Sequence, residues 1–135
     1  MKALNPYLLF DGNAREAMEF YQDCFGGKLE MMDYESSPEI EIADKHKKLI
    51  MHSSLRCEHT TILASDNMPG KKLKKGDNIQ ISIDCISESE LTQFFFSLSE
   101  EGEILFPLQD TFWGAKFGQV RDKFGVHWML SFERE

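Results

Sequence analysis

The order of predicted elements repeats along this chain of 135 residues, and the repeat limits the folds that the chain can adopt. Each half begins with an apolar strand and continues with a helix whose apolar residues recur at helical spacing. A glycine follows the helix, and then come three strands with no helix between them. With an offset of 75 residues the halves align at Leu4 with Ile79, Leu8 with Ile83, Phe20 with Phe95, and Gly27 with Gly102. A duplicated βαβββ unit is therefore predicted.

Three successive strands in each half exclude a doubly wound parallel sheet, which needs helices between its strands. Each half has one helix and one apolar sheet face, so both halves are needed for a curved, eight-stranded mixed sheet of the α+β class. One domain is expected over residues 1–135, with module one at about 1–68 and module two at about 77–135. The strands are predicted at residues 4–10, 28–34, 48–56, 59–65, 77–84, 103–108, 115–121 and 126–132.

Two capping-box patterns predict where the helices begin. Asn13 precedes Glu16 by three residues, and Ser87 precedes Glu90 at the same spacing. Each first residue is expected to accept a hydrogen bond from the backbone of the third residue after it. The first helix is expected to run to about Phe25 and to end at the following glycines.

Composition and charge limit the kinds of partner that are expected for this protein. The chain is 41% hydrophobic and 28% charged, which is typical of a soluble globular domain, and its net charge of −8 predicts no nucleic-acid partner. No apolar run approaches the roughly 18 residues of a membrane span, so no membrane partner is expected. The three cysteines are widely spaced and odd in number, which favours the cytoplasm over a disulfide framework or a structural zinc site.

The segment from Pro107 to Leu130 is dense in aromatic rings and glycines, with charged residues between them. Such a composition more often indicates an aromatic core with glycine turns. Rings beside glycines also suit a wall of tightly turning strands that approaches a ligand. Within the segment, Asp122 and Gly125 predict a turn before the last strand, with Gly125 at positive φ.

Several stretches together resemble the PhnB-like branch of the glyoxalase/bleomycin-resistance superfamily, also called vicinal oxygen chelate proteins. They are NPYLLFDGNAREAMEFYQDCFGG, LIMHSSL, ILASDNMPG and PLQDTFWGAKFGQVRDKFGVHWML, and they cover the chain except for residues 35–47. The resemblance implies two βαβββ modules that form a cup-shaped site, often completed across a homodimer.

The resemblance also implies where metal-dependent members place their ligands, on the first, fourth, fifth and eighth strands. Those positions fall at or near Pro6, at Ala64 or Ser65, at Asn78 or Gln80, and at Met129. Proline and methionine do not ligate a hard divalent ion, and an amide would be one weak ligand. No metal and no cofactor are therefore expected.

The first functional hypothesis is metal-free binding of a small molecule in a dimeric cup. Gln80 and Ser82 would supply hydrogen bonds, and four rings would supply stacking or apolar wall: Phe10, Phe112, Trp113 and Phe117. His52 and His127 lie on predicted strands and complete the expected ligand-binding set, although a lone strand histidine is more often structural.

The alternative is a metal-dependent enzyme of the glyoxalase or dioxygenase kind with non-standard ligands such as His52 and His127. A methyltransferase, a label often attached to PhnB-like proteins, would need a glycine-rich loop between a strand and a helix, and the sequence has none. A phosphate cradle for phosphonates is likewise absent from the sequence.

Overall fold

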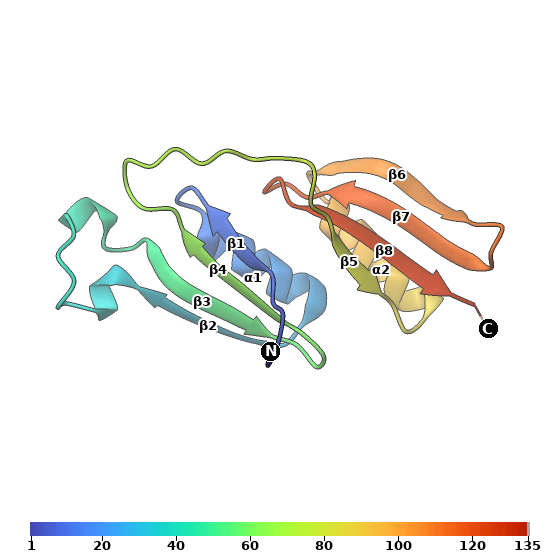
Figure 1. The fold of residues 1–135 in the computed structure, drawn as a ribbon, viewed down its shortest axis with the longest axis horizontal. Coiled ribbons are helices and arrows are strands. Elements are labelled where there is room, and N and C mark those ends of the chain that lie inside the picture. The colour runs from blue at the N-terminus through green and yellow to red at the C-terminus, as the bar shows by residue number, and fades with distance from the viewer. Residues whose placement is uncertain (135) are drawn as a thin grey trace. The chain divides into compact units, whose positions relative to one another are not determined.

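The computed structural model describes residues 1–134 and divides into two compact units, Met1–Lys74 and Lys75–Glu135. Each unit contains one four-stranded mixed sheet and one helix of 12 residues (Figure 1). The duplicated βαβββ order and the α+β class predicted from the sequence are confirmed, and the eight strands are distributed over two sheets.

The first unit follows the order β1-β4-β3-β2 across its sheet. Strand β1 pairs with β4 in parallel, and the other pairings are antiparallel. Its elements are β1 (Tyr7–Phe10), α1 (Ala14–Phe25), β2 (Lys28–Asp33), the 3-10 turns η1 (Tyr34–Ser36) and η2 (Asp44–His46), β3 (Ile50–Arg56) and β4 (Thr61–Asp66).

The second unit repeats this arrangement with the order β5-β8-β7-β6. Strand β5 pairs with β8 in parallel, and β8 and β6 flank β7 in antiparallel fashion. Its elements are β5 (Ile81–Asp84), α2 (Glu88–Ser99), β6 (Glu103–Asp110), β7 (Ala115–Arg121) and β8 (His127–Glu133). The matching strand orders support duplication more strongly than the slight sequence identity between the halves.

Each helix buries one apolar face against its own sheet. In the first unit, Tyr21 of α1 packs against Phe10 of β1, with ring centroids 6.4 Å apart. In the second unit, Phe95 of α2 lies over Gly118 of β7, where an added Cβ would meet the ring. The largest fully buried side chains include Trp128, Tyr21, Phe95, Met18, Leu55, Leu91, Leu98 and Leu130. Their burial is the main apolar stabilisation of the two units.

Of the two predicted helix caps, one is present in the structure and the other is not. The prediction for Ser87 is confirmed: its hydroxyl accepts a hydrogen bond from the Glu90 backbone at 3.0 Å. The prediction for Asn13 is wrong, since its side chain makes no cap hydrogen bond. Instead the Asp66 carboxylate accepts from Ala14 N at 2.9 Å and from Ile50 N at 2.8 Å. A buried carboxylate at the end of β4 thus caps the start of α1 in place of the Asn13 side chain.

The strand predicted at 77–84 is wrong in its first half, because β5 begins only at Ile81. Its partner β8 begins at His127, and Ile81 pairs with Trp128, so the residues before Gln80 have no strand beside them. Ile79 is consequently 75% exposed despite its place in an alternating pattern. Strand β1 is also shorter than expected, since its pairing with β4 starts at Tyr7.

The turn between β7 and β8 has the predicted form. Gly125 has φ +91°, and Asp122 Oδ1 accepts from Phe124 N at 2.9 Å and from Val126 N at 3.0 Å. The other carboxylate oxygen accepts from Trp128 Nε1 at 2.8 Å, which satisfies a buried indole donor. The turn therefore also positions the largest core side chain of the second unit.

Cys24 and Cys85 are buried, and all three cysteines are free thiols. Within residues 1–134, neither helix has the length and apolar character needed to cross a bilayer.

The aligned glycines Gly27 and Gly102 make the same close approach in the two units. A Cβ on Gly27 would collide with the carbonyl oxygen of Arg56, where β3 ends, and one on Gly102 would collide with that of Arg121, where β7 ends. We therefore expect Gly102→Ala to lower the free energy of unfolding by about 1–3 kcal/mol, because backbone must shift to admit the methyl group. Urea unfolding followed by circular dichroism measures the change.

Gly76→Ala is the matched control, because the nearest atom to its added Cβ is Asn78 Oδ1 at 3.5 Å, an ordinary contact. Its stability is expected to stay unchanged or rise slightly. Equal stability of the Gly102→Ala and Gly76→Ala proteins would contradict the close approach.

Candidate functional site: the open face of the second sheet

One face of the second sheet is covered by α2, and the opposite face is not. Side chains alternate along each strand, so Gly118, Val120, Trp128 and Leu130, which lie toward α2, fix the direction of their neighbours. The residues pointing the other way define what we call the open face: Ser82, Asp84, Phe106, Phe117, Gln119, Arg121, His127, Met129 and Ser131.

The strand register arranges this open face in rows. Ser82 lies beside Met129, which lies beside Gln119, which pairs with Phe106. One row further along, the order is Asp84, Ser131 and Phe117. Ser131 Oγ donates to Asp84 Oδ1 at 3.2 Å, and the Phe117 and Phe106 rings stack with centroids 5.0 Å apart. Hydroxyls and a carboxylate thus stand on one side of the face and two stacked rings on the other.

A hollow of about 1140 Å³ lies at the His127 end of the open face. It is lined by Lys75, Gly76, Asp77, Gln80, Glu101, Gly102, Glu103, Leu105, Arg121, Asp122, Lys123, Gly125 and His127. Two of its cations have acidic partners: Arg121 Nη2 lies 2.7 Å from Glu103 Oε2, and Lys123 Nζ lies 3.4 Å from Glu101 Oε2. The hollow is therefore polar, and both of these cations are paired with carboxylates.

The structure brings together some of the residues predicted for the site. Ser82, Phe117 and His127 share the open face, and Gln80 joins His127 in the lining of the hollow. The sequence analysis did not predict a role for Phe106. Its ring stacks on that of Phe117, and this contact depends on how β6 pairs with β7, which no local pattern indicates.

Phe112 and Trp113 do not join this group. They form the turn between β6 and β7, beyond the end of the sheet opposite to His127, and are 98% and 61% exposed. Ala115, at the far end of β7, lies six positions before Arg121, which pairs with His127. The two ends of the strand are therefore roughly 20 Å apart. The two rings pack edge to face on each other, with centroids 5.0 Å apart.

Phe10 and His52 belong to the first unit. Phe10 is 2% exposed and is packed under α1, so it lies in the core and not on a ligand-accessible face; its predicted role in the pocket wall does not match this position. His52 is exposed on β3, with its ring 6.2 Å from that of Tyr7. Tyr7 donates its hydroxyl hydrogen bond to Ser65 Oγ at 3.1 Å, a contact between β1 and β4 that corresponds to the one between Asp84 and Ser131.

The residues at the positions that the resemblance implies for metal ligands do not fit a hard divalent ion. Met129 faces outward on β8 with Ser82 beside it, and Ala64 is buried toward α1. Ser65 is already bonded to Tyr7. Residues 1–134 contain no group of three or more His, Cys, Asp or Glu side chains able to hold a metal ion together.

Cys85 follows Asp84 directly but is not built as a nucleophile. Burial raises the pKa of its thiol to about 12, and the nearby Glu90 and Asp84 carboxylates act in the same direction. A thiol with this pKa holds almost no thiolate at neutral pH.

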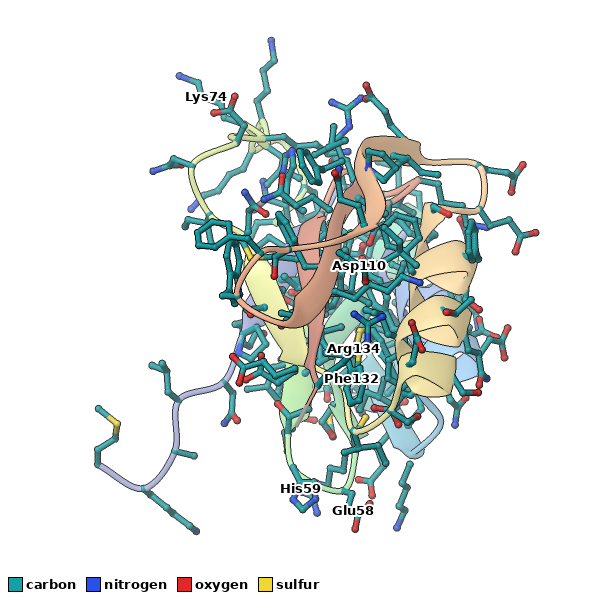
Figure 2. All side chains as sticks on the ribbon, turned by 90° about the vertical axis from the view of Figure 1, so that its right-hand side faces the viewer. Glu58, His59, Lys74, Asp110, Phe132 and Arg134 are labelled. Carbon is teal, nitrogen blue, oxygen red and sulfur yellow. The ribbon has the colours of Figure 1, made fainter. Side chains whose placement is uncertain are left out.

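A charged cluster closes the second unit near the β6–β7 turn (Figure 2). Arg134 donates to Asp110 Oδ1 at 2.6 Å and to Glu88 Oε1 at 2.8 Å, and Lys116 donates to the same Glu88 oxygen at 3.2 Å. The hydrogen bond from Arg134 lowers the pKa of Asp110, and those from Lys116 and Arg134 lower the pKa of Glu88. The cluster ties the ends of β6 and β8 to the start of α2.

The fold is shared with solved structures of distant sequence. A glyoxalase family protein from Bacillus cereus is 9% identical, with a TM-score of 0.67 over 100% of this chain and 95% of that chain. The duplicated βαβββ units therefore have the glyoxalase fold.

Nearer relatives identify the family. Protein PA1353 from Pseudomonas aeruginosa is 40% identical, with a TM-score of 0.88 over 98% of this chain and 100% of that chain. Protein YjdN from Escherichia coli K12 is 32% identical over 95% of this chain and 93% of that protein. A PhnB protein from Bacillus cereus, described as a putative 3-demethylubiquinone-9 3-methyltransferase, is 25% identical with a TM-score of 0.76, over 97% of this chain and 99% of that chain.

The family model described as 3-demethylubiquinone-9 3-methyltransferase matches residues 2–131. The chain belongs to this PhnB-like family.

We expect the Arg134 cluster to make stability depend on pH. Carboxyl groups whose folded pKa is lowered stabilise the fold above their ordinary pKa values, 3.8 for Asp110 and 4.5 for Glu88, and lose this effect as pH falls through the lowered values. Arg134→Gln should therefore lower the melting temperature at pH 7, and the difference from the parent protein should vanish near about pH 2.

Arg15→Gln is the control, because Arg15 makes a single, longer contact of 3.6 Å with Asp33 and should give a smaller pH-dependent difference. Thermal melts across the pH range provide the comparison. A constant difference between Arg134→Gln and the parent protein down to pH 2 would show that the cluster does not act through these carboxylates.

Proposed function

We propose that the protein binds a small organic molecule without a metal, on the open face of the second sheet. The observation that carries the proposal is the shared position of Ser82, Phe117 and His127 on one face that α2 leaves uncovered. Hydroxyls, an amide and stacked rings within one face provide directional hydrogen bonds together with apolar contact, which is the usual composition of small-molecule sites. The adjoining hollow adds room for a polar extension of the ligand.

The donor set favours binding over metal-dependent chemistry. A glyoxalase- or dioxygenase-type reaction needs several nitrogen or oxygen ligands around one divalent ion. The corresponding positions hold a thioether at Met129 and a hydroxyl at Ser65 that is bonded to Tyr7. The metal-dependent alternative would have to recruit His52 and His127 from two different sheets.

Methyl transfer is not part of the proposal, although the family description names it. A nucleotide-containing methyl donor is commonly held where a strand turns into a helix, by backbone N–H groups at the helix start. In this chain the N–H of Ala14 at the start of α1 donates to the Asp66 carboxylate, and the N–H of Glu90 at the start of α2 donates to the Ser87 hydroxyl. These internal contacts compete with an anionic cofactor at both places.

The proposal places the protein in the cytoplasm as a homodimer. Three free thiols suit a reducing compartment. Ile104, Leu105 and Phe106 expose apolar surface along the edge strand β6, and Trp113 adds to it at the following turn. Apolar surface on a sheet edge is a common place for a second copy to bind.

Metal independence can be tested on one sample with a neutral probe, 1-naphthalenemethanol, which has a flat apolar body and one hydroxyl group. Treatment with a chelator is expected to leave its affinity unchanged, because the proposed contacts involve only side chains of the open face. Phe117→Ala should weaken binding about tenfold by removing one of the two stacked rings. Calorimetric titration measures both effects.

Phe96→Ala provides the matched control, since Phe96 is an exposed ring on α2, which covers the opposite face, and its loss should not change the affinity. Loss of binding on chelation, with recovery on adding Zn, Ni, Mn or Fe, would overturn the metal-free proposal. Metal analysis of the His52→Ala and His127→Ala proteins would then show whether these two residues are the ligands.

A further inference from the structure

The open face carries one carboxylate without a cationic partner. Asp84 is exposed at the end of β5, and its hydrogen-bond partner is the hydroxyl of Ser131, at 3.2 Å. Across the described chain, residues 1–134, no Lys, Arg or His nitrogen lies within 4.0 Å of its oxygens. The hydroxyl donates one hydrogen bond and leaves the negative charge uncompensated.

Two cations of the open face and the adjoining hollow already have acidic partners. Arg121 pairs with Glu103 at 2.7 Å, and Lys123 pairs with Glu101 at 3.4 Å. The net charge of −8 on the whole chain adds a long-range attraction for cations. A ligand that compensates Asp84 must therefore bring its own positive charge.

Two stacked rings lie across the sheet from this carboxylate. Phe117 occupies the same row as Asp84, two strands away, and Phe106 stacks on it with an interplanar angle of 26°. Strands are spaced by about 4.8 Å, so the carboxylate and the rings are roughly 10 Å apart. Phe106 is 37% exposed and offers apolar surface to a ligand.

We propose that the ligand of this face is an organic cation, an ammonium group joined to a flat apolar body; this rests on the function proposed above. The ammonium donates to Asp84, and the hydroxyl of Ser82, two residues earlier on the same strand face, lies on the ammonium side of the ligand. The flat body covers Phe117 and Phe106, whose ring faces also attract positive charge. A distance of roughly 10 Å suits a bicyclic aromatic amine or a longer amphiphilic amine.

Anionic ligands fit this arrangement poorly. A phosphonate or carboxylate placed between Ser82 and Phe117 would face the Asp84 charge, and Arg121 already has an acidic partner. A neutral ligand of the same shape would gain the ring contacts but would leave the carboxylate without an ionic partner. Cationic, neutral and anionic ligands should therefore differ in affinity for an electrostatic reason, and probes of matched shape can measure this difference.

Three naphthalene derivatives separate these classes: 1-naphthylmethylammonium, neutral 1-naphthalenemethanol and anionic 1-naphthylacetate. By calorimetry at low ionic strength, the ammonium compound is expected to bind about tenfold more tightly than the alcohol, because its charged N–H donor forms an ion pair with the Asp84 carboxylate and the uncharged hydroxyl does not. The acetate should bind most weakly. Raising the salt concentration should weaken the ammonium compound alone, through screening of an exposed pair.

Asp84→Asn is expected to bring the affinity of the ammonium compound down to that of the alcohol, with the alcohol itself unchanged. Glu19→Gln removes the same charge from the exposed side of α1 and should leave all three affinities as they were. This control separates the local contact at Asp84 from the general effect of net charge.

The outcomes distinguish this inference from the function on which it rests. If the alcohol binds as tightly as the ammonium compound, or if Asp84→Asn changes nothing, the cationic assignment is overturned and the binding face stands. If none of the three probes binds, both are overturned. If Glu19→Gln weakens the ammonium compound as much as Asp84→Asn does, the specific contact with Asp84 is overturned.

Discussion

A four-stranded sheet has two faces, and in each unit of this protein a single 12-residue helix covers only one of them. Such a helix is roughly 18 Å long and packs on one face of its own sheet. Strand alternation then divides the second sheet into a core side with Val120, Trp128 and Leu130 and an open side with Phe117 and Ser131. The open side combines hydroxyls, a carboxylate and rings, a composition that suits contact with a ligand better than either a core or a solvent-only surface.

Buried carboxylates hold this arrangement in place. Asp66 joins the end of β4 to the start of α1 and to Ile50 of β3, and Asp122 joins the β7–β8 turn to the indole of Trp128. Each accepts several backbone or side-chain N–H groups, so removal of either would leave buried donors unsatisfied. The open face is therefore presented by strands whose ends are fixed, which limits the conformational cost of binding a ligand.

Local patterns in the sequence were sufficient for most of the fold, and register was the missing information for the site. The Ser87 cap depends on neighbours within three residues and was predictable, whereas the cap of α1 comes from Asp66, 52 residues after Ala14, and has no local signal. Phe10 and Phe117 look alike in sequence, but one packs under α1 and the other faces outward. Only the pairing of strands decides between these two positions.

The central claim is that the open face of the second sheet, with Asp84 at one side and the Phe117–Phe106 stack at the other, is where the ligand binds. A crystal structure of the protein with 1-naphthylmethylammonium tests this most directly. The account predicts the ammonium nitrogen within hydrogen-bond distance of Asp84, about 3 Å, and the naphthalene ring against Phe117. A probe bound under either helix, at the first sheet, or on a metal ion held by His52 or His127 would contradict it.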